Sequence, residues 1–138
     1  MLTLLTLAPI VMAGACSSVP VISPIESTQS AIVETTVRTH TYMLAHRTYP
    51  TDLKSLPLRE GFANQITDGW GRDLIYSVDD QGVISLTSLG RDGRTGGSNE
   101  DADITRRYRT RNEDGSLNID DELWLVESEI VDPPPKSE

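Results

Sequence analysis

Cysteine and histidine are nearly absent from this 138-residue chain, which contains one Cys and two His. A single cysteine cannot form an intrachain disulfide, and zinc sites usually recruit Cys or His, so a disulfide framework and a zinc centre are both disfavoured. Basic residues are scarce as well: 12 Lys and Arg stand against 21 Asp and Glu, for a formal net charge of -9. Binding to nucleic acid and electrostatic adhesion to anionic lipid both need an excess of Lys and Arg, so we expect neither.

Signatures of catalysis are missing too. The chain has no Gly-x-Ser-x-Gly elbow, no phosphate-binding glycine loop and no Cys–His pair that specifies a nucleophile. His40 and His46 lie six positions apart, off the i, i+4 spacing at which two imidazoles on a helix share an ion, so we assign them an exposed or packing role. We therefore expect a non-enzymatic protein without a small-molecule substrate.

The only extended apolar run lies in residues 1–15. It is short for a bilayer span, contains Pro9 and ends in small residues, which is typical of a cleavable secretory signal. Because the small residues lead directly to Cys16, the segment has the form of a lipoprotein signal, in which Cys16 is lipidated and becomes the first mature residue. The alternative is a plain signal peptide followed by an incidental thiol.

These features predict a domain organisation and a location. We expect residues 1–15 to be the signal, 16–22 a linker, 23–130 one folded domain and 131–138 a disordered, proline-containing tail. The residue after the cysteine is Ser17, which favours sorting to the outer membrane. The expected protein is lipid-anchored in the cell envelope and faces the periplasm.

A long helix is predicted after the linker, from about Ser23 to Arg47. Ser23 can act as the N-cap, Pro24 suits the first helical position, and Glu26 completes a capping box. Apolar residues then recur at roughly helical spacing and predict one buried stripe, formed by Ile25, Ile32, Val33, Val37 and Leu44.

Two strands are predicted further along the chain, at residues 74–78 and 83–89, with residues 79–82 as the hairpin between them. Before the strands, Thr51 can cap a short turn, and a tight Asp-Gly turn should deliver Trp70 to the core. These elements predict an α+β fold, with one long N-terminal helix packed on a small antiparallel sheet.

The most distinctive segment is residues 88–104, SLGRDGRTGGSNEDADI. Its four glycines let the backbone turn sharply, and its acidic and amide side chains supply several oxygens at once. A hard cation such as Ca²⁺ prefers this donor chemistry. The segment therefore predicts a calcium-binding loop, against the alternative of a solvated acidic turn.

Several short stretches of this chain resemble the C-terminal domain of the major pseudopilin of bacterial type II secretion. They occur in that family's order and at about its spacing, over residues 30 to 105, and they are Tyr49-Pro50-Thr51, Asp68-Gly69-Trp70-Gly71, Ser88-Leu89-Gly90 and Asp101-Ala102-Asp103-Ile104. The resemblance implies a long helix against a small antiparallel sheet. It also implies a set of calcium ligands, namely a backbone carbonyl at Leu89 and the carboxylates of Asp92, Asp101 and Asp103. Asn99 or a carbonyl near residues 97–98 would complete the coordination shell. The long apolar helix that builds the fibre in this family has no counterpart in this sequence, so we expect the domain not to polymerise.

The chain leaves the family pattern beyond Ile104. Four arginines between residues 106 and 111 form either a solvated strand that balances the acidic loop or a patch for a partner. Residues 123–126, Leu-Trp-Leu-Val, have strand character and can either add to the sheet edge or bind a partner. Between them, residues 112–115 are interpreted as a turn rather than an EF-hand loop, because Thr110 stands where the first Asp of such a loop belongs.

These expectations combine into one functional hypothesis. The chain is a non-enzymatic, calcium-binding, pseudopilin-like envelope lipoprotein, a structural or interaction component associated with type II protein secretion, with proteins of that machine as partners. The alternative is a free-standing periplasmic binding or enzyme domain that reuses the fold, since fold alone does not determine function.

Overall fold

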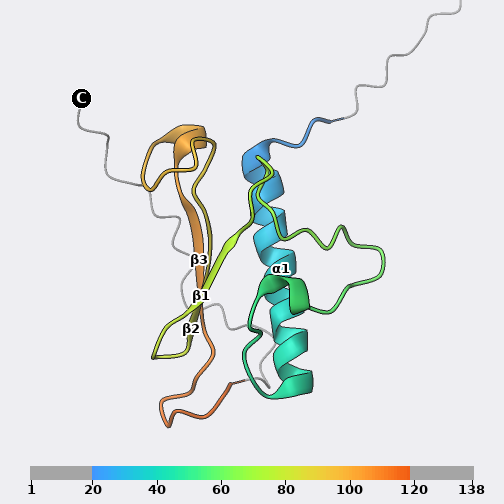
Figure 1. Ribbon diagram of the computed structural model, residues 1–138, viewed down its shortest axis with the longest axis vertical. Coiled ribbons are helices and arrows are strands. Elements are labelled where there is room, and N and C mark those ends of the chain that lie inside the picture. Colours follow the sequence, from blue (N-terminus) through green and yellow to red (C-terminus); the bar gives the residue numbers. More distant parts are fainter. Residues whose placement is uncertain (1–19, 119–138) are drawn as a thin grey trace, which may run out of the picture.

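The computed structural model describes residues 20–118, which form a long helix beside a small sheet (Figure 1). The main elements are α1, Pro24–His46; β1, Ile75–Val78; β2, Val83–Ser88; and β3, Ile104–Arg109. Two short 3-10 turns lie in the connections, η1 at Leu53–Ser55 and η2 at Asn99–Asp101. The predicted α+β architecture is confirmed. The predictions for residues 1–15, Cys16, residues 123–126 and residues 131–138 concern positions outside the described residues.

Helix α1 begins as its sequence predicts. The Ser23 hydroxyl accepts the Glu26 N–H at 3.2 Å, and the Glu26 carboxylate accepts the Ser23 N–H at 3.0 Å, which completes the capping box. These hydrogen bonds hold the pKa of Glu26 below its usual value. The helix ends at His46, where Arg47 adopts the left-handed conformation and its N–H bonds to the Met43 carbonyl.

The predicted apolar stripe of α1 is wrong. Val33, Val37 and Leu44 are 48%, 40% and 41% exposed, and of the predicted set only Ile32 is fully buried, while Ile25 packs at the edge of the core. The buried face instead contains Thr28, Ala31, Ile32, Thr35, Arg38, Thr39 and Met43. Threonine can lie on this face because its hydroxyl is satisfied locally: those of Thr28 and Thr39 each bond to the carbonyl four residues earlier at 2.8 Å.

The three strands form one antiparallel sheet in the order β1-β2-β3. The central strand β2 alternates between half-buried and buried residues, and Ile84 and Leu86 point into the core. The predicted hairpin is present, with the Gly82 N–H bonded to the Asp79 carbonyl at 3.1 Å and Gly82 at φ 74°. The half-buried Trp70 packs against the core, as expected from the turn that precedes it.

A long connection joins α1 to the sheet, and Arg38 holds it. This side chain is 2% exposed, and its guanidinium donates to three backbone carbonyls, those of Pro57 at 2.8 Å, Asn64 at 3.0 Å and Leu56 at 3.3 Å. Burial lowers the pKa of Arg38. The cap of η1 is Asp52, whose carboxylate accepts the Ser55 N–H at 2.9 Å; the prediction of Thr51 was one residue early.

Within the described part of the chain, no helix combines the length and apolar character needed to cross a membrane.

Candidate metal site in the loop between β2 and β3

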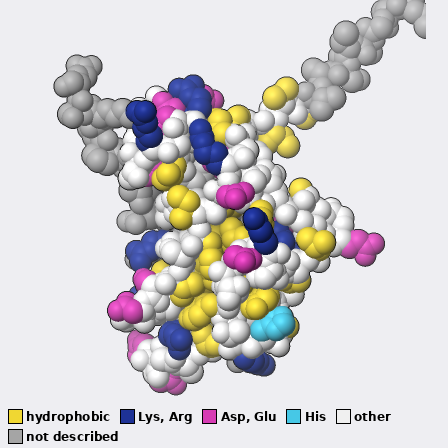
Figure 2. Space-filling view, viewed as in Figure 1, with side chains coloured by type: hydrophobic (Ala, Val, Ile, Leu, Met, Phe, Trp, Pro, Cys, Tyr) yellow, Lys and Arg dark blue, Asp and Glu magenta, His cyan; other side chains and the backbone are white. Residues whose placement is uncertain are grey.

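The glycine-rich segment forms the loop that joins β2 to β3. The ladder pair Ser88 and Ile104 closes its base, and the Arg91 N–H bonds to the Glu100 carbonyl at 2.7 Å across it. Gly90 lies at φ 66°, and a Cβ atom there would approach the Ala102 carbonyl oxygen to 2.6 Å, so this position requires glycine. Figure 2 shows basic and acidic side chains gathered at the end of the molecule that carries the loop in Figure 1.

Asp68 connects the loop to the turn that contains Trp70. It is 2% exposed, and its Oδ1 accepts the backbone N–H groups of Trp70 at 3.0 Å and Arg72 at 2.9 Å. Its Oδ2 accepts the Ser88 hydroxyl at 2.7 Å, and the Ser88 Oγ in turn accepts the Gly90 N–H at 3.2 Å. One buried carboxylate therefore connects the Trp70 turn to the start of the loop.

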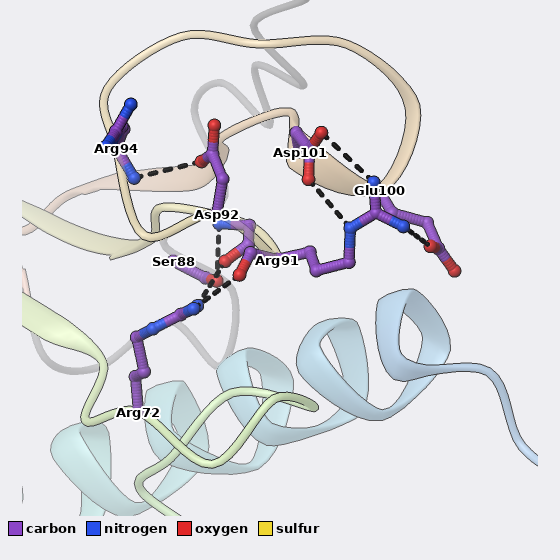
Figure 3. Close-up of polar contacts among 8 residues, drawn as sticks. Arg72, Ser88, Arg91, Asp92, Arg94, Glu100 and Asp101 are labelled. Carbon is purple, nitrogen blue, oxygen red and sulfur yellow. Dashed lines mark hydrogen bonds and ion pairs between the residues drawn. The ribbon is translucent and has the colours of Figure 1, made fainter.

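Arg72 makes a second connection to the loop. Its guanidinium donates to the carbonyl oxygens of Gly90 and Arg91, and Figure 3 shows it reaching the loop close to Ser88. A planar guanidinium can hold two neighbouring carbonyls at once, which a lysine cannot do with the same geometry. The first turn of the loop is thus fixed before its acidic residues are reached.

Asp103 has the most unusual surroundings of the predicted ligands. Its Oδ2 accepts the Gly96 N–H at 3.0 Å, whereas its Oδ1 is buried and has no hydrogen-bond partner among the described residues. A buried carboxylate oxygen without a donor carries a desolvation cost that a bound cation would offset.

Asp101 and Asp92 have different partners. The Asp101 carboxylate binds the Arg91 guanidinium at 2.9 and 3.2 Å, and Arg91 also contacts Glu100 at 2.9 Å (Figure 3). The hydrogen bond to Asp101 raises the pKa of Arg91. The Asp92 Oδ1 accepts the Arg94 N–H at 3.0 Å, as an Asp in a turn often does.

The remaining predicted ligands lie in the same loop. Asn99 begins η2 with φ 53°, and its carbonyl accepts the Ala102 N–H at 3.2 Å. Leu89 directly precedes the Gly90 turn. Over residues 20–118, no three Asp, Glu, His or Cys side chains converge in a metal-binding group. Calcium also uses carbonyl and amide oxygens, so the site stays a prediction.

Sequence reasoning missed the residues that shape the loop: Asp68, Arg72, Ser88 and Arg91. Asp68, Arg72 and Ser88 make hydrogen bonds to backbone groups or to one another, and the bonded residues are at most 20 positions apart in the chain. A buried Asp in an Asp-Gly-Trp-Gly turn was the available signal, because an acidic residue buried next to an aromatic one needs several donors.

The fold and loop together define a class of protein, small α+β domains in which one long helix packs on a three-stranded antiparallel sheet and a glycine-rich acidic loop joins the last two strands. The family model described as type II secretion system (T2SS), protein G, matches residues 22–107. The chain belongs to this family. Its members, the pseudopilins, are non-enzymatic structural components of the cell envelope that assemble with other proteins of the secretion machinery. No curated protein matches the chain.

Proposed function

We propose that this chain is a calcium-binding lipoprotein of the cell envelope that serves as a structural or interaction component of type II protein secretion. The observation that carries the proposal is the family match over residues 22–107, which spans α1, the whole sheet up to Arg107 and the loop. A structural, non-enzymatic role follows from that family.

Calcium is the metal that the loop chemistry fits. Every predicted donor is an oxygen: the Leu89 carbonyl, the Asn99 amide and the carboxylates of Asp92, Asp101 and Asp103. The buried, unpaired Oδ1 of Asp103 is the atom that most needs a cation.

Binding through Asp101 requires a rearrangement. Arg91 holds both carboxylate oxygens of Asp101, so this ion pair has to open before Asp101 can bind a metal. Arg91 retains Glu100 as an alternative partner, and the Arg91 side chain is 57% exposed, so the opening costs little. Arg91 and calcium therefore compete for the same carboxylate.

Cys16 supplies the membrane attachment in this proposal. Lipidation of Cys16 would place the domain on a short linker, residues 16–22, at the periplasmic side of a membrane, and Ser17 favours the outer membrane. The partners are then proteins of the secretion machine that reach this surface.

Deletion of the gene in its host tests the functional role. We expect proteins that leave the cell by type II secretion to accumulate in the periplasm, and complementation with the wild-type gene to restore their release. Complementation with Asp103→Asn should restore release less well than Asp80→Asn, which removes one acidic charge from the β1–β2 hairpin instead. Unchanged release in the deletion strain would contradict the secretion role and would favour a free-standing periplasmic binding or enzyme domain.

A further inference from the structure

An apolar groove lies beside the N-terminal half of α1, apart from the loop between β2 and β3. Its apolar lining includes Val21, Ile22, Val33 and Phe62, which are 95%, 67%, 48% and 51% exposed. The groove has a volume of about 780 Å³ and is open to solvent. Large apolar side chains gathered at a protein surface mark a place where another apolar surface binds.

The solvent face of α1 extends this apolar surface. At 3.6 residues per turn, Val33, Val37 and Leu44 lie on one side of the helix, and the buried Thr35 lies on the opposite side. A helix that packs only on its own sheet buries its apolar residues and exposes its polar ones. Because α1 shows the reverse pattern, its outer face is suited to contact with a second apolar surface.

The charged residues that line the groove are two acids and one arginine, and each has a partner within the protein. Glu26 belongs to the capping box, and the Glu34 carboxylate accepts the Asn64 N–H at 2.8 Å. The Arg59 guanidinium lies 3.6 Å from the centre of the Phe62 ring. An arginine beside an apolar surface can bury its stem and keep its charged head in water. This lining does not select for anionic ligands, so the surface that it contacts is apolar.

The position of the groove in the chain indicates which surface this is. Pro20 lines the groove, and Cys16 is four residues earlier in the sequence. Four residues span at most about 14 Å in any conformation. Figure 2 shows apolar side chains where the described part of the chain begins. A membrane that holds Cys16 is therefore within reach of the edge of the groove.

We propose that this groove contacts the lipid bilayer to which Cys16 is attached, and that the contact sets the orientation of the domain on the membrane. The inference rests on the lipid anchor of the proposed function. Val21, Ile22 and Phe62 enter the headgroup region, where apolar side chains gain from burial. The anchor supplies the affinity, and a weak contact is sufficient because attachment keeps the groove at a high local concentration near the lipid.

Chemical attachment tests the contact without depending on acylation in cells. The purified chain is coupled through Cys16, its only cysteine, to a maleimide lipid in phosphatidylcholine vesicles with brominated acyl chains. Phe62→Trp places a fluorescent reporter in the groove, and Ile75→Trp is the matched control on β1, at a position that is 49% exposed. We expect brominated lipid to reduce the added emission of Phe62→Trp on the order of twofold and to leave that of Ile75→Trp unchanged.

A second variant removes the apolar lining next to the anchor. Val21→Ser with Ile22→Ser changes two exposed side chains and should reduce the quenching of the Phe62→Trp reporter. Equal quenching of both reporters, or none of Phe62→Trp, would overturn the proposal. Quenching that needs anionic lipid or disappears at high salt would assign the contact to charges and would also overturn it.

A second copy of the chain is the other occupant that the experiment detects. A blue shift of the Phe62→Trp emission that grows with protein concentration in the absence of vesicles would assign the groove to that copy and would overturn the membrane contact. Failure of the anchor is distinguishable, because absence of lipid on Cys16 in cells does not change the result with chemically attached protein. Failure of the groove contact leaves the role in secretion standing.

Discussion

At the scale of single residues, the proposed calcium binding depends most on Asp103 and Arg91. One carboxylate oxygen of Asp103 is buried and has no hydrogen-bond donor among the described residues. Asp101, two positions earlier in the chain, is paired with the positive charge of Arg91. A protein cation and a metal ion are alternative ways of neutralising the same acidic loop. The balance between them should be measurable.

Calcium should raise the thermal stability of the wild-type chain. A ligand that binds only the native state stabilises it by about 2.7 kcal/mol at a hundredfold excess over its Kd, which for a domain of this size corresponds to on the order of 10 °C in Tm. Asp103→Asn keeps the shape of the side chain and should remove the difference between calcium and chelator, whereas Asp80→Asn should retain it. Differential scanning calorimetry with calcium and with chelator measures both.

Arg91→Gln provides the opposite variant in the same experiment. With the competing guanidinium removed from Asp101, calcium should bind more tightly, so the difference in Tm between calcium and chelator should be larger than in the wild-type chain. Equal melting curves with calcium and with chelator for the wild-type chain would reject the site. Weaker binding by Arg91→Gln would show that Arg91 organises the loop for the metal rather than competing with it.

At the scale of elements, α1 is joined to the connection before the sheet through Arg38. Three carbonyls of residues 56–64 converge on one guanidinium that is almost fully buried, with no carboxylate among its hydrogen-bond acceptors. The arrangement replaces secondary structure in a segment that has little of its own. The stability of this segment should therefore depend on one side chain.

Arg38→Met should lower the free energy of unfolding by about 3 kcal/mol, since it removes the donor from one buried and two partly buried carbonyls. Arg38→Lys should also destabilise, because an ammonium group cannot reach three carbonyls in the geometry of the guanidinium fork. The control is Arg59→Met, which removes a guanidinium that lies 3.6 Å from the centre of the Phe62 ring in the same segment. Urea unfolding followed by circular dichroism gives the three values, and a loss below about 1 kcal/mol for Arg38→Met would contradict the assigned role.

At the scale of the whole molecule, the proposed membrane anchor depends on the net charge of the chain and on its single cysteine. A net charge of -9 opposes adsorption to anionic lipid, so attachment has to come from a covalent lipid if the protein is anchored. Cys16 is the only residue in the chain that can carry a thioether-linked lipid.

Cells grown with a palmitate analogue should label the wild-type protein, and the protein should partition into the detergent phase. Cys16→Ser should abolish the labelling and leave the protein in the aqueous phase, because the lipid is the source of its membrane affinity. Ser17→Ala is the matched control and should still be labelled. An intact, unacylated Cys16 in the mature wild-type protein, observed by mass spectrometry, would contradict the proposed lipid anchor.

The sequence by itself determined the parts of this protein that depend on neighbours in the chain. The capping box of Ser23 and Glu26 and the Asp79–Gly82 hairpin each involve residues three positions apart, so residue type and spacing specify their hydrogen bonds. The acidic glycine-rich loop was also recognisable, because its composition and its family resemblance are both local.

Only the tertiary structure decided which surfaces meet. Periodicity assigned Val33 and Val37 to the core, but the buried face holds Thr28, Thr35 and Thr39, whose hydroxyls find carbonyls within the helix or in a distant loop. The sequence likewise did not predict that Asp68 supports the loop or that one oxygen of Asp103 is buried without a partner. A buried polar group is acceptable or costly according to partners that the fold brings to it, and sequence spacing does not record those partners.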